Sequence, residues 1–496
     1  MRHHSYLWLL GLFYLAFLSS GLSYSQERVF SFSDSAIIQR LKTDISILAS
    51  DSLEGREAGT RGDTMASVYI INRFMEIGLQ PANNDSGSYL QQVTFDYNDF
   101  PRDENFLHTD HRAYKYPKDF GMTSFSSNDK INGELLDVGH GICDSVLAFN
   151  DYSGKENPSE RVLLMEFPLP ENLANDSTTL ERLSIRERLE EAFRRGALGV
   201  ILWNSDSPEY PELFDFKHPS TLQGAVIFVA ADVARALKKS EGQSVYLMAT
   251  RLESTKKYNN VIGFLNNQAS QTVIVGAHYD HVGINHRGNP RCGADDNASG
   301  VAMMLELARY LQQHCDSSFN YLFIAFGAEE LGMIGSGYFC EHPVIPLDEI
   351  AYMCNFDMVG RLGAEGNRIT ALATETSPQW NIIYRDMPKF PFKVKRYKGP
   401  SSFSDQECFY KKKVPVFYIT TGLHADYHTY RDTPDRINYT GMIPIAKFAE
   451  EFIIRTEKIG HIDFQKVSGK ATFFSDLNYY IKQIGHLFDM PLQDFP

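Results

Sequence analysis

The chain has 496 residues, of which 43% are hydrophobic and 22% are charged. This composition is typical of a globular protein, and the length predicts more than one domain. A formal net charge of −14 argues against a nucleic-acid or anionic-membrane partner, because either would require a basic surface. No run of about 18 apolar residues occurs in the body of the chain, so no membrane span is predicted in the mature protein. The oligomeric state stays unknown from the sequence.

The first 25 residues have the pattern of a secretory signal. Arg2 precedes an apolar run over residues 7–18, and small residues follow up to Ser25. This order is typical of a signal peptide, with a short buried helix as the alternative interpretation. We therefore expect residues 1–25 to be removed and the protein to be secreted or periplasmic. Its six cysteines are too few for a disulfide framework, although export permits one or two bridges of unknown pairing.

Residues 26–125 are expected to form the N-terminal part of the catalytic domain. Apolar spacing predicts a helix over 37–48, followed by a loop and a second helix that ends near Ile77. The stretch 85–125 is aromatic and polar without a clear period, which indicates strands and loops.

Residues 126–250 read as a separate inserted α/β module. Buried strands are predicted at 162–167, 200–203 and 225–229, and an amphipathic helix at 183–195. The segment contains no plausible cluster of metal ligands or nucleophiles. We therefore interpret it as an accessory insert.

Residues 251–458 alternate between apolar strands and helices, and they are predicted to form the catalytic domain. The predicted strands are 261–265, 273–277, 321–326, 351–356 and 414–420, and the predicted helices are 298–313 and 443–456. Short apolar strands joined by helical crossovers predict an α/β fold with a doubly wound, mostly parallel sheet flanked by helices. The tail, residues 459–496, is expected to be packed extra structure with one helix over 476–487.

Ligand-type side chains follow several of these strands at the point where each strand ends. They are His278, the pair Glu329 and Glu330, Asp357 and His428. In open α/β sheets, binding sites form beyond the carboxyl ends of the strands. These segments should therefore meet at one edge of the sheet, joined by Asp296 from the loop that enters the helix at 298.

The charges of these residues suit two divalent zinc ions. Three carboxylates (Asp296, Glu330 and Asp357) with neutral imidazoles offset three of the four positive charges, so a hydroxide between the ions is favoured. Asp296 has two oxygens and can bridge the ions. Glu329 is not needed as a ligand and suits a general base. Asp280 is placed to orient the imidazole two residues before it.

The motifs HYDHVG, GADDNASG, FGAEELGMIGSGYF, NFDMVG and DYHTYRDTPD resemble those of the co-catalytic zinc aminopeptidases, metallopeptidase family 28. The resemblance covers about residues 41–79, which include SDSLEGREAGT, and 258–457. It implies the zinc aminopeptidase fold, and the insert is similar to a protease-associated domain.

The resemblance also implies a role for each matching residue. One zinc is expected at His278 and Asp357, and the other at Glu330 and His428, with Asp296 as the bridge. Carried over in the same way, Glu329 is the base and Asp280 orients His278.

Two positions near the expected pocket leave alternatives open. Tyr427 resembles a tyrosine that stabilises the oxyanion in some family members, or it is a packed loop aromatic. Gln406 stands where the family commonly has histidine, which leaves the substrate preference more open.

Together these features predict an exported exopeptidase with two Zn²⁺ ions that acts on peptides or proteins with a free N-terminus. The principal expectation is an aminopeptidase that uses a metal-bridging hydroxide. A carboxypeptidase or dipeptidase on the same fold is the main alternative. A glutaminyl cyclase and a non-catalytic binding protein are further alternatives, which the intact ligand set and Glu329 disfavour.

Overall fold

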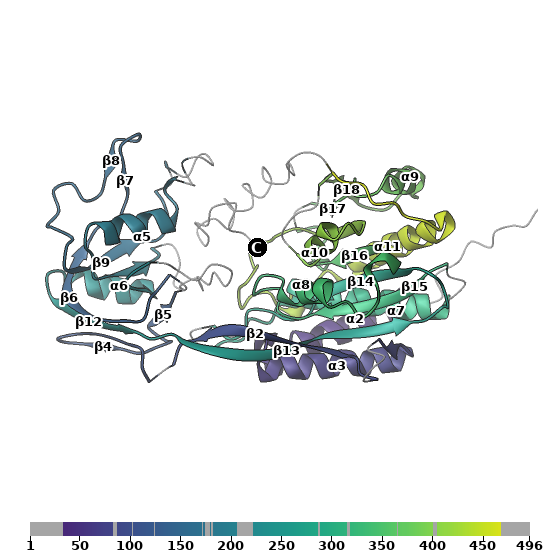
Figure 1. Cartoon of the computed structure of the whole chain (residues 1–496), viewed down its shortest axis with the longest axis horizontal. Helices are drawn as coiled ribbons and strands as arrows, with labels where there is room; N and C mark the ends of the chain where they lie inside the picture. Colours follow the sequence, from purple (N-terminus) through teal and green to yellow (C-terminus); the bar gives the residue numbers. More distant parts are fainter. Residues whose placement is uncertain are drawn as a thin grey trace, which may run out of the picture.

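The computed structural model describes residues 33–467, apart from 83–86, 102, 124, 171, 174–178, 180–181, 206–221, 286–287, 315–317, 365 and 400–403. The expected signal peptide and the expected tail helix over 476–487 lie outside the described residues. The chain forms two lobes that are joined by a long two-stranded ribbon (Figure 1). Among the described helices, none is long and apolar enough to cross a membrane.

The larger lobe is built on a nine-stranded mixed sheet. Its strands are, in spatial order, β1 (Gln80–Pro81), β13 (Leu252–Leu265), β15 (Asn320–Phe326), β14 (Thr272–His278), β16 (Ile350–Phe356), β19 (Val416–Thr420), β17 (Arg368–Leu372) and β18 (Lys393–Arg396), with β2 (Leu90–Asp99) paired to β13. The four central strands, β15, β14, β16 and β19, are parallel, whereas β13 and β17 join them antiparallel. The α/β prediction is confirmed, and the parallel arrangement holds for the centre of the sheet.

Helices cover both faces of this sheet, as a doubly wound fold requires. One face packs against α2 (Asp34–Leu48), α3 (Arg61–Ile77), α7 (Gly300–Gln313), α9 (Gln379–Asp386) and α11 (Tyr439–Ile459). The other face packs against α8 (Ile334–Glu341) and α10 (Gln406–Lys411). The central strands are buried along their whole length, which explains their unbroken apolar sequences.

A disulfide between Cys340 and Cys408 links α8 to α10 on the second face. The pairing could not be read from the sequence, because spacing alone does not fix which cysteines meet. Cys143, Cys292 and Cys354 are free thiols. The bridge joins two cysteines that are 68 residues apart in the sequence, and it fixes α10 to α8, the helix that follows β15.

The smaller lobe contains an eight-stranded sheet and, among its described residues, two helices. Its strands are, in spatial order, β4 (Ala113–Tyr114), β3 (Phe106–Thr109), β12 (Ser244–Ala249), β6 (Asp129–Asp137), β9 (Arg161–Glu166), β10 (Gly199–Trp203), β11 (Ala225–Val229) and β5 (Phe120–Met122). The helices are α5 (Ile185–Arg194) and α6 (Ala231–Lys238), and a separate hairpin pairs β7 (Cys143–Asp144) with β8 (Phe149–Asn150).

The structure places the start of this sheet about 20 residues before the predicted boundary at 126, because β3, β4 and β5 all belong to it. Strands of two to four residues have too few positions to show an alternating pattern, which is why the sequence left them in an unassigned stretch. The smaller lobe meets the larger one through the ribbon of β2 and β13, paired from Asp99 opposite Leu252 to Leu90 opposite Val261.

Candidate metal centre

The ligand-type side chains meet at the carboxyl end of the parallel strands. His278 is the last residue of β14, Asp357 follows β16 directly, and Glu330 lies four residues beyond the end of β15. His428 lies in the loop after β19, and Asp296 lies in the turn before α7. Because β15, β14, β16 and β19 run in the same direction, their ends deliver these side chains to one edge, as the sequence predicts.

One group of donor atoms consists of His278, Asp296 and Asp357. The Nε2 atom of His278 lies 3.4 Å from Asp296 Oδ1 and 3.4 Å from Asp357 Oδ1. All three side chains are buried. The second oxygen of Asp357, Oδ2, lies 3.5 Å from the hydroxyl of Tyr418, which donates to it.

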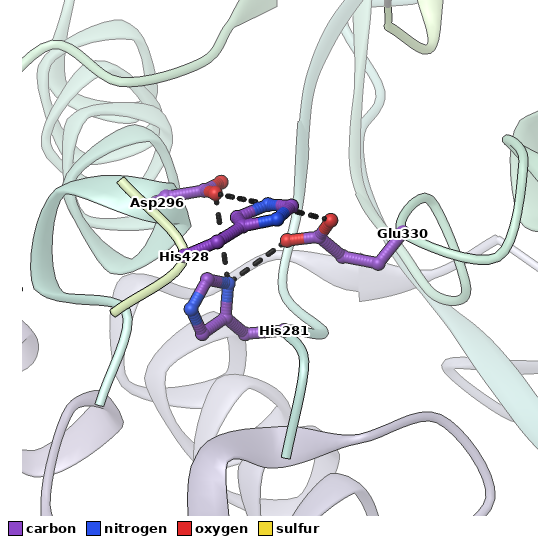
Figure 2. A group of neighbouring side chains, drawn as sticks. All are labelled: His281, Asp296, Glu330 and His428. Atoms are coloured by element: carbon purple, nitrogen blue, oxygen red, sulfur yellow. Dashed lines mark hydrogen bonds and ion pairs between the residues drawn. The ribbon is translucent and has the colours of Figure 1, made fainter. Parts of the chain in front are cut away.

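A second group consists of His281, Asp296, Glu330 and His428 (Figure 2). The Nε2 atom of His428 lies 3.1 Å from Asp296 Oδ2 and 3.0 Å from Glu330 Oε2. The Nδ1 atom of His281 lies 2.8 Å from Glu330 Oε1. His281 is absent from the predicted site, although the motif HYDH places it three residues after His278.

The donor atoms of both groups fit zinc. Imidazole nitrogens and carboxylate oxygens are zinc ligands in proteins. Among the described residues, His428 Nε2 and Asp296 Oδ2 are buried and face each other at 3.1 Å without making a hydrogen bond. Buried polar atoms are normally hydrogen-bonded, so donor atoms that converge without such bonds suit a bound cation. The two oxygens of Asp296 face different groups, Oδ1 toward His278 and Oδ2 toward His428.

The titratable groups of the centre are strongly perturbed. Burial raises the pKa of Glu329 well above its usual range, helped by the charges of Glu330 and Asp357, although His278 opposes the shift. Burial opposes protonation of His428, yet the carboxylates of Glu330 and Asp296 together outweigh it and raise the pKa of His428 to about 10. Without a metal ion, the negative charge of the carboxylates favours protonated imidazoles. A bound cation would neutralise that negative charge in place of the imidazole protons.

The sequence GADDNASG holds Asp296 through its neighbours. The backbone amides of Asp295 and Asp296 both donate to Asp432 Oδ2, at 2.9 and 3.0 Å. The Asn297 side chain donates to Phe356 O (2.9 Å) and accepts from Met358 N (3.1 Å), the residues on either side of Asp357. The loop that carries Asp296 is therefore hydrogen-bonded directly to the end of β16.

Gly300 makes this contact possible. A Cβ atom at Gly300 would lie 2.3 Å from both Asn297 Oδ1 and Phe356 O. Such distances are far below any van der Waals contact, so a side chain at this position would separate α7 from β16. The final glycine of the motif is a packing requirement of the site.

Asp280 has a wider role than the sequence predicted. Its Oδ1 lies 3.7 Å from Nδ1 of His278, on the side of the ring that faces away from the donor group. Its two carboxylate oxygens also accept hydrogen bonds from the backbone amides of Glu329 (3.0 Å) and Glu330 (3.2 Å). Asp280 therefore positions the loop after β15 as well as facing the His278 ring.

Arg56, the last residue of a short 3₁₀ helix (Asp51–Arg56) after α2, is a positioning residue that the sequence did not reveal. It is fully buried, and its guanidinium donates to the backbone carbonyls of Leu48, Tyr279, Cys292 and Gly293. Those carbonyls belong to α2, to the end of β14 and to the start of the Asp296 loop. The motif SLEGREAG thus positions the backbone next to the donor residues through Arg56, without contributing a donor atom to the centre.

The last two predicted positions differ in their relation to the centre. The Tyr427 ring stacks on the His428 ring, with centroids 3.8 Å apart. Burial raises the pKa of Tyr427 well above its usual range, helped by the charge of Asp296, so its hydroxyl stays a hydrogen-bond donor. Gln406 is fully buried and accepts from the Asn355 side chain at 3.0 Å, so it lies within the packed interior.

The backbone is strained at three positions that adjoin the donor residues. Ala328, Met358 and His428 have positive φ angles of 55°, 59° and 54°. Side-chain-bearing residues rarely adopt this region, and they do so most often at functional sites, where the surrounding structure holds them. The strain here falls beside Glu329, beside Asp357 and at His428 itself.

Known proteins resemble this chain over the segment that contains the donor residues. The model of the family described as Peptidase family M28 matches residues 260–453. The chain is 32% identical over 187 residues to aminopeptidase YwaD of Bacillus subtilis. The aligned region covers 36% of this chain and 38% of the relative. The chain is also 32% identical over 175 residues to the probable lipoprotein aminopeptidase LpqL of Mycobacterium tuberculosis, covering 35% and 33%. The chain thus spans less than half the length of these two relatives.

A solved structure shares the fold over most of the chain. It is that of BSAP, a zinc aminopeptidase from Bacillus subtilis, with a TM-score of 0.64 and 19% identity over 87% of this chain and 96% of that one. The aminopeptidase of Aneurinibacillus sp. strain AM-1 matches with a TM-score of 0.56 and 20% identity, over 88% and 98%. The resemblance seen in the sequence motifs is confirmed, and residues 260–453, which contain all the donor residues described above, form a peptidase family M28 domain.

Proposed function

We propose that the protein is an exported zinc-dependent exopeptidase, and specifically an aminopeptidase that binds two Zn²⁺ ions. The observation that carries the proposal is the position of Asp296, whose two oxygens face two separate groups of donor atoms. The names of the relatives YwaD and LpqL, both aminopeptidases, support the class of substrate. In this proposal His278 and Asp357 hold one ion, Glu330 and His428 hold the other, and Asp296 bridges them.

Zinc in such a site lowers the pKa of water and polarises the scissile carbonyl. Glu329 then serves as the general base that takes a proton from the attacking water and returns it to the departing amine. Burial supports this role because it raises the pKa of Glu329 and so makes the carboxylate a stronger proton acceptor. Tyr427 donates a hydrogen bond to the oxyanion that forms on the substrate, and Asp280 fixes the orientation of His278.

Binding of the substrate follows from the charge of the site. An aminopeptidase must hold the protonated α-amine of its substrate, and the surplus of acidic groups at the centre provides the complementary charge. We propose that these groups select peptides with a free N-terminus. A carboxypeptidase would instead need a cationic group to hold the terminal carboxylate.

Export and the role of the smaller lobe complete the proposal. The Cys340–Cys408 disulfide supports an oxidising compartment, either the periplasm or the outside of the cell. We propose that the smaller lobe is a protease-associated domain that limits access to the site or contacts the substrate. Its position at the end of the β2–β13 ribbon supports an accessory role, because none of its described residues is a donor residue of the centre.

A peptide library tests the proposed reaction. Peptides with free and acetylated N-termini are incubated with zinc-loaded protein, with chelated protein and with the Glu329→Gln variant, and the products are identified by mass spectrometry. We expect metal-dependent loss of single residues from free N-termini only. Loss of C-terminal residues would indicate a carboxypeptidase, cleavage of dipeptides alone a dipeptidase, and loss of ammonia from N-terminal glutamine a cyclase. No change with any peptide would contradict the enzyme proposal.

A further inference from the structure

His281 lies in the donor cluster, although nothing in the proposed function requires it. Its side chain is fully buried, and its Nδ1 atom lies 2.8 Å from Glu330 Oε1 and 3.6 Å from Asp296 Oδ2. Nδ1 faces the same space as Nε2 of His428, which contacts the same two carboxylates at 3.0 and 3.1 Å (Figure 2). Four donor atoms from four residues therefore converge, all within 4.8 Å of one another.

The ring of His281 is fixed in this position by its surroundings. Its backbone amide donates to Arg56 O at 3.2 Å, and its ring meets the His428 ring edge to face, with centroids 5.4 Å apart. Gly293 leaves room for the ring, since a Cβ atom there would lie 2.6 Å from His281 Cδ2. A ring held this closely presents Nδ1 to the cluster without a rearrangement.

The two donor groups are therefore unequal. The group of His278, Asp296 and Asp357 has three residues, whereas the group around His428 has four; a further group, His278 with Glu329 and Glu330, adds only the proposed base and a carboxylate already counted at His428. Zinc sites closed by four protein ligands are typically structural, whereas catalytic sites keep three protein ligands and an open position. The number of donors thus separates a closed position from an open one.

We propose that His281 is a fourth protein ligand at the position of Glu330 and His428. This inference rests on the proposed zinc-dependent function. It makes the four-donor position the tighter one, filled first. The three-donor position at His278 and Asp357 is the weaker one, and it keeps the open coordination site.

A direct count of imidazole ligands tests the assignment. Metal-free protein is given one equivalent of Zn²⁺, and X-ray absorption spectroscopy measures the number of imidazoles bound to it. We expect two in the wild-type protein and one in His281→Ala. We also expect the affinity for the first equivalent to fall by more than the roughly 10- to 100-fold that losing an outer-shell partner costs. His461→Ala, which changes an exposed histidine in an ion pair with Asp463, is the matched control and should behave as wild type.

Each outcome decides between the possibilities. One imidazole in the wild-type sample would overturn the inference, and because that sample carries no substitution, misfolding of a variant does not affect it. An equal count in wild type and a folded His281→Ala variant would reduce His281 to a hydrogen-bond partner of Glu330. A wild-type protein that binds no zinc at all would instead refute the proposed function itself.

Discussion

Replacing Asn297 should loosen the metal centre, although Asn297 offers no donor atom to it. Its side chain donates to Phe356 O at 2.9 Å and accepts from Met358 N at 3.1 Å and Gly300 N at 2.9 Å. Asp357 lies between two of these partners. The substitution Asn297→Ala removes all three hydrogen bonds and therefore releases the end of β16 from the loop that precedes α7.

The size of the effect follows from the groups left behind. Gly300 N also bonds to the backbone carbonyl of Asn297, so Phe356 O and Met358 N are the two buried groups that lose this partner. Each such group costs about 1–3 kcal/mol, which gives about 2–6 kcal/mol for the pair. At about 2–4 °C per kcal/mol for a domain of this size, the melting temperature should fall by at least about 4 °C.

Thermal unfolding followed by circular dichroism, with and without Zn²⁺, measures this change. Asn297→Asp is an informative second variant, since it keeps the acceptor atoms but places a carboxylate oxygen against Phe356 O, and it should also be destabilised. Asn381→Ala, at an exposed position of α9, is the control and should stay within about 0.5 kcal/mol of wild type. A melting temperature for Asn297→Ala equal to that of the control would refute the reasoning.

Three further predictions concern single residues. Glu329→Gln should keep its zinc content, measured by elemental analysis, and lose activity on the order of a thousandfold, whereas an active variant would exclude Glu329 as the base. Asp296→Ala should reduce zinc at both positions in the same analysis, and an unchanged content would exclude a bridging role. Burial, together with the nearby charge of Glu306, raises the pKa of Glu450 in α11 to about 9. Because this folded-state value exceeds the unfolded value of about 4.3, the stability it contributes is present at low pH and is lost as the pH rises toward 9. The free energy of unfolding, measured with urea, should therefore decline from about pH 5 to about pH 9 in the wild-type protein, and it should decline less in Glu450→Gln. Parallel plots of this free energy against pH for the two proteins would contradict the prediction.

The sequence predicted those parts of the fold that have a clear period. The buried strands of the larger lobe appear as apolar runs, and the rule that sites form beyond strand ends placed His278, Asp357 and Glu330 together. The same reasoning missed β17 and β18, because these strands are short and their neighbours in the sheet are set by long-range contacts. It also described the whole sheet as mostly parallel, since an apolar run does not reveal the direction of the strand beside it.

The supporting residues of the centre were harder to predict for a different reason. His281 stands in the printed motif, but whether its ring turns toward Glu330 depends on the turn after β14 and on the missing side chain of Gly293. Arg56 and Asp432 act by hydrogen bonds to backbone groups, and a sequence carries no signal for the backbone atoms that a side chain will reach. Residue type indicates a donor to a metal far more readily than it indicates a partner of the backbone.

The ribbon of β2 and β13 has a consequence for how this architecture can change during evolution. Asp99 and Leu252 lie opposite each other on neighbouring strands, so the smaller lobe begins and ends at adjacent points. A short turn between these two residues would close the ribbon as a simple hairpin and leave the order of the nine strands unchanged. The smaller lobe can therefore be gained, exchanged or lost as a unit, while the peptidase domain keeps its topology and its donor residues.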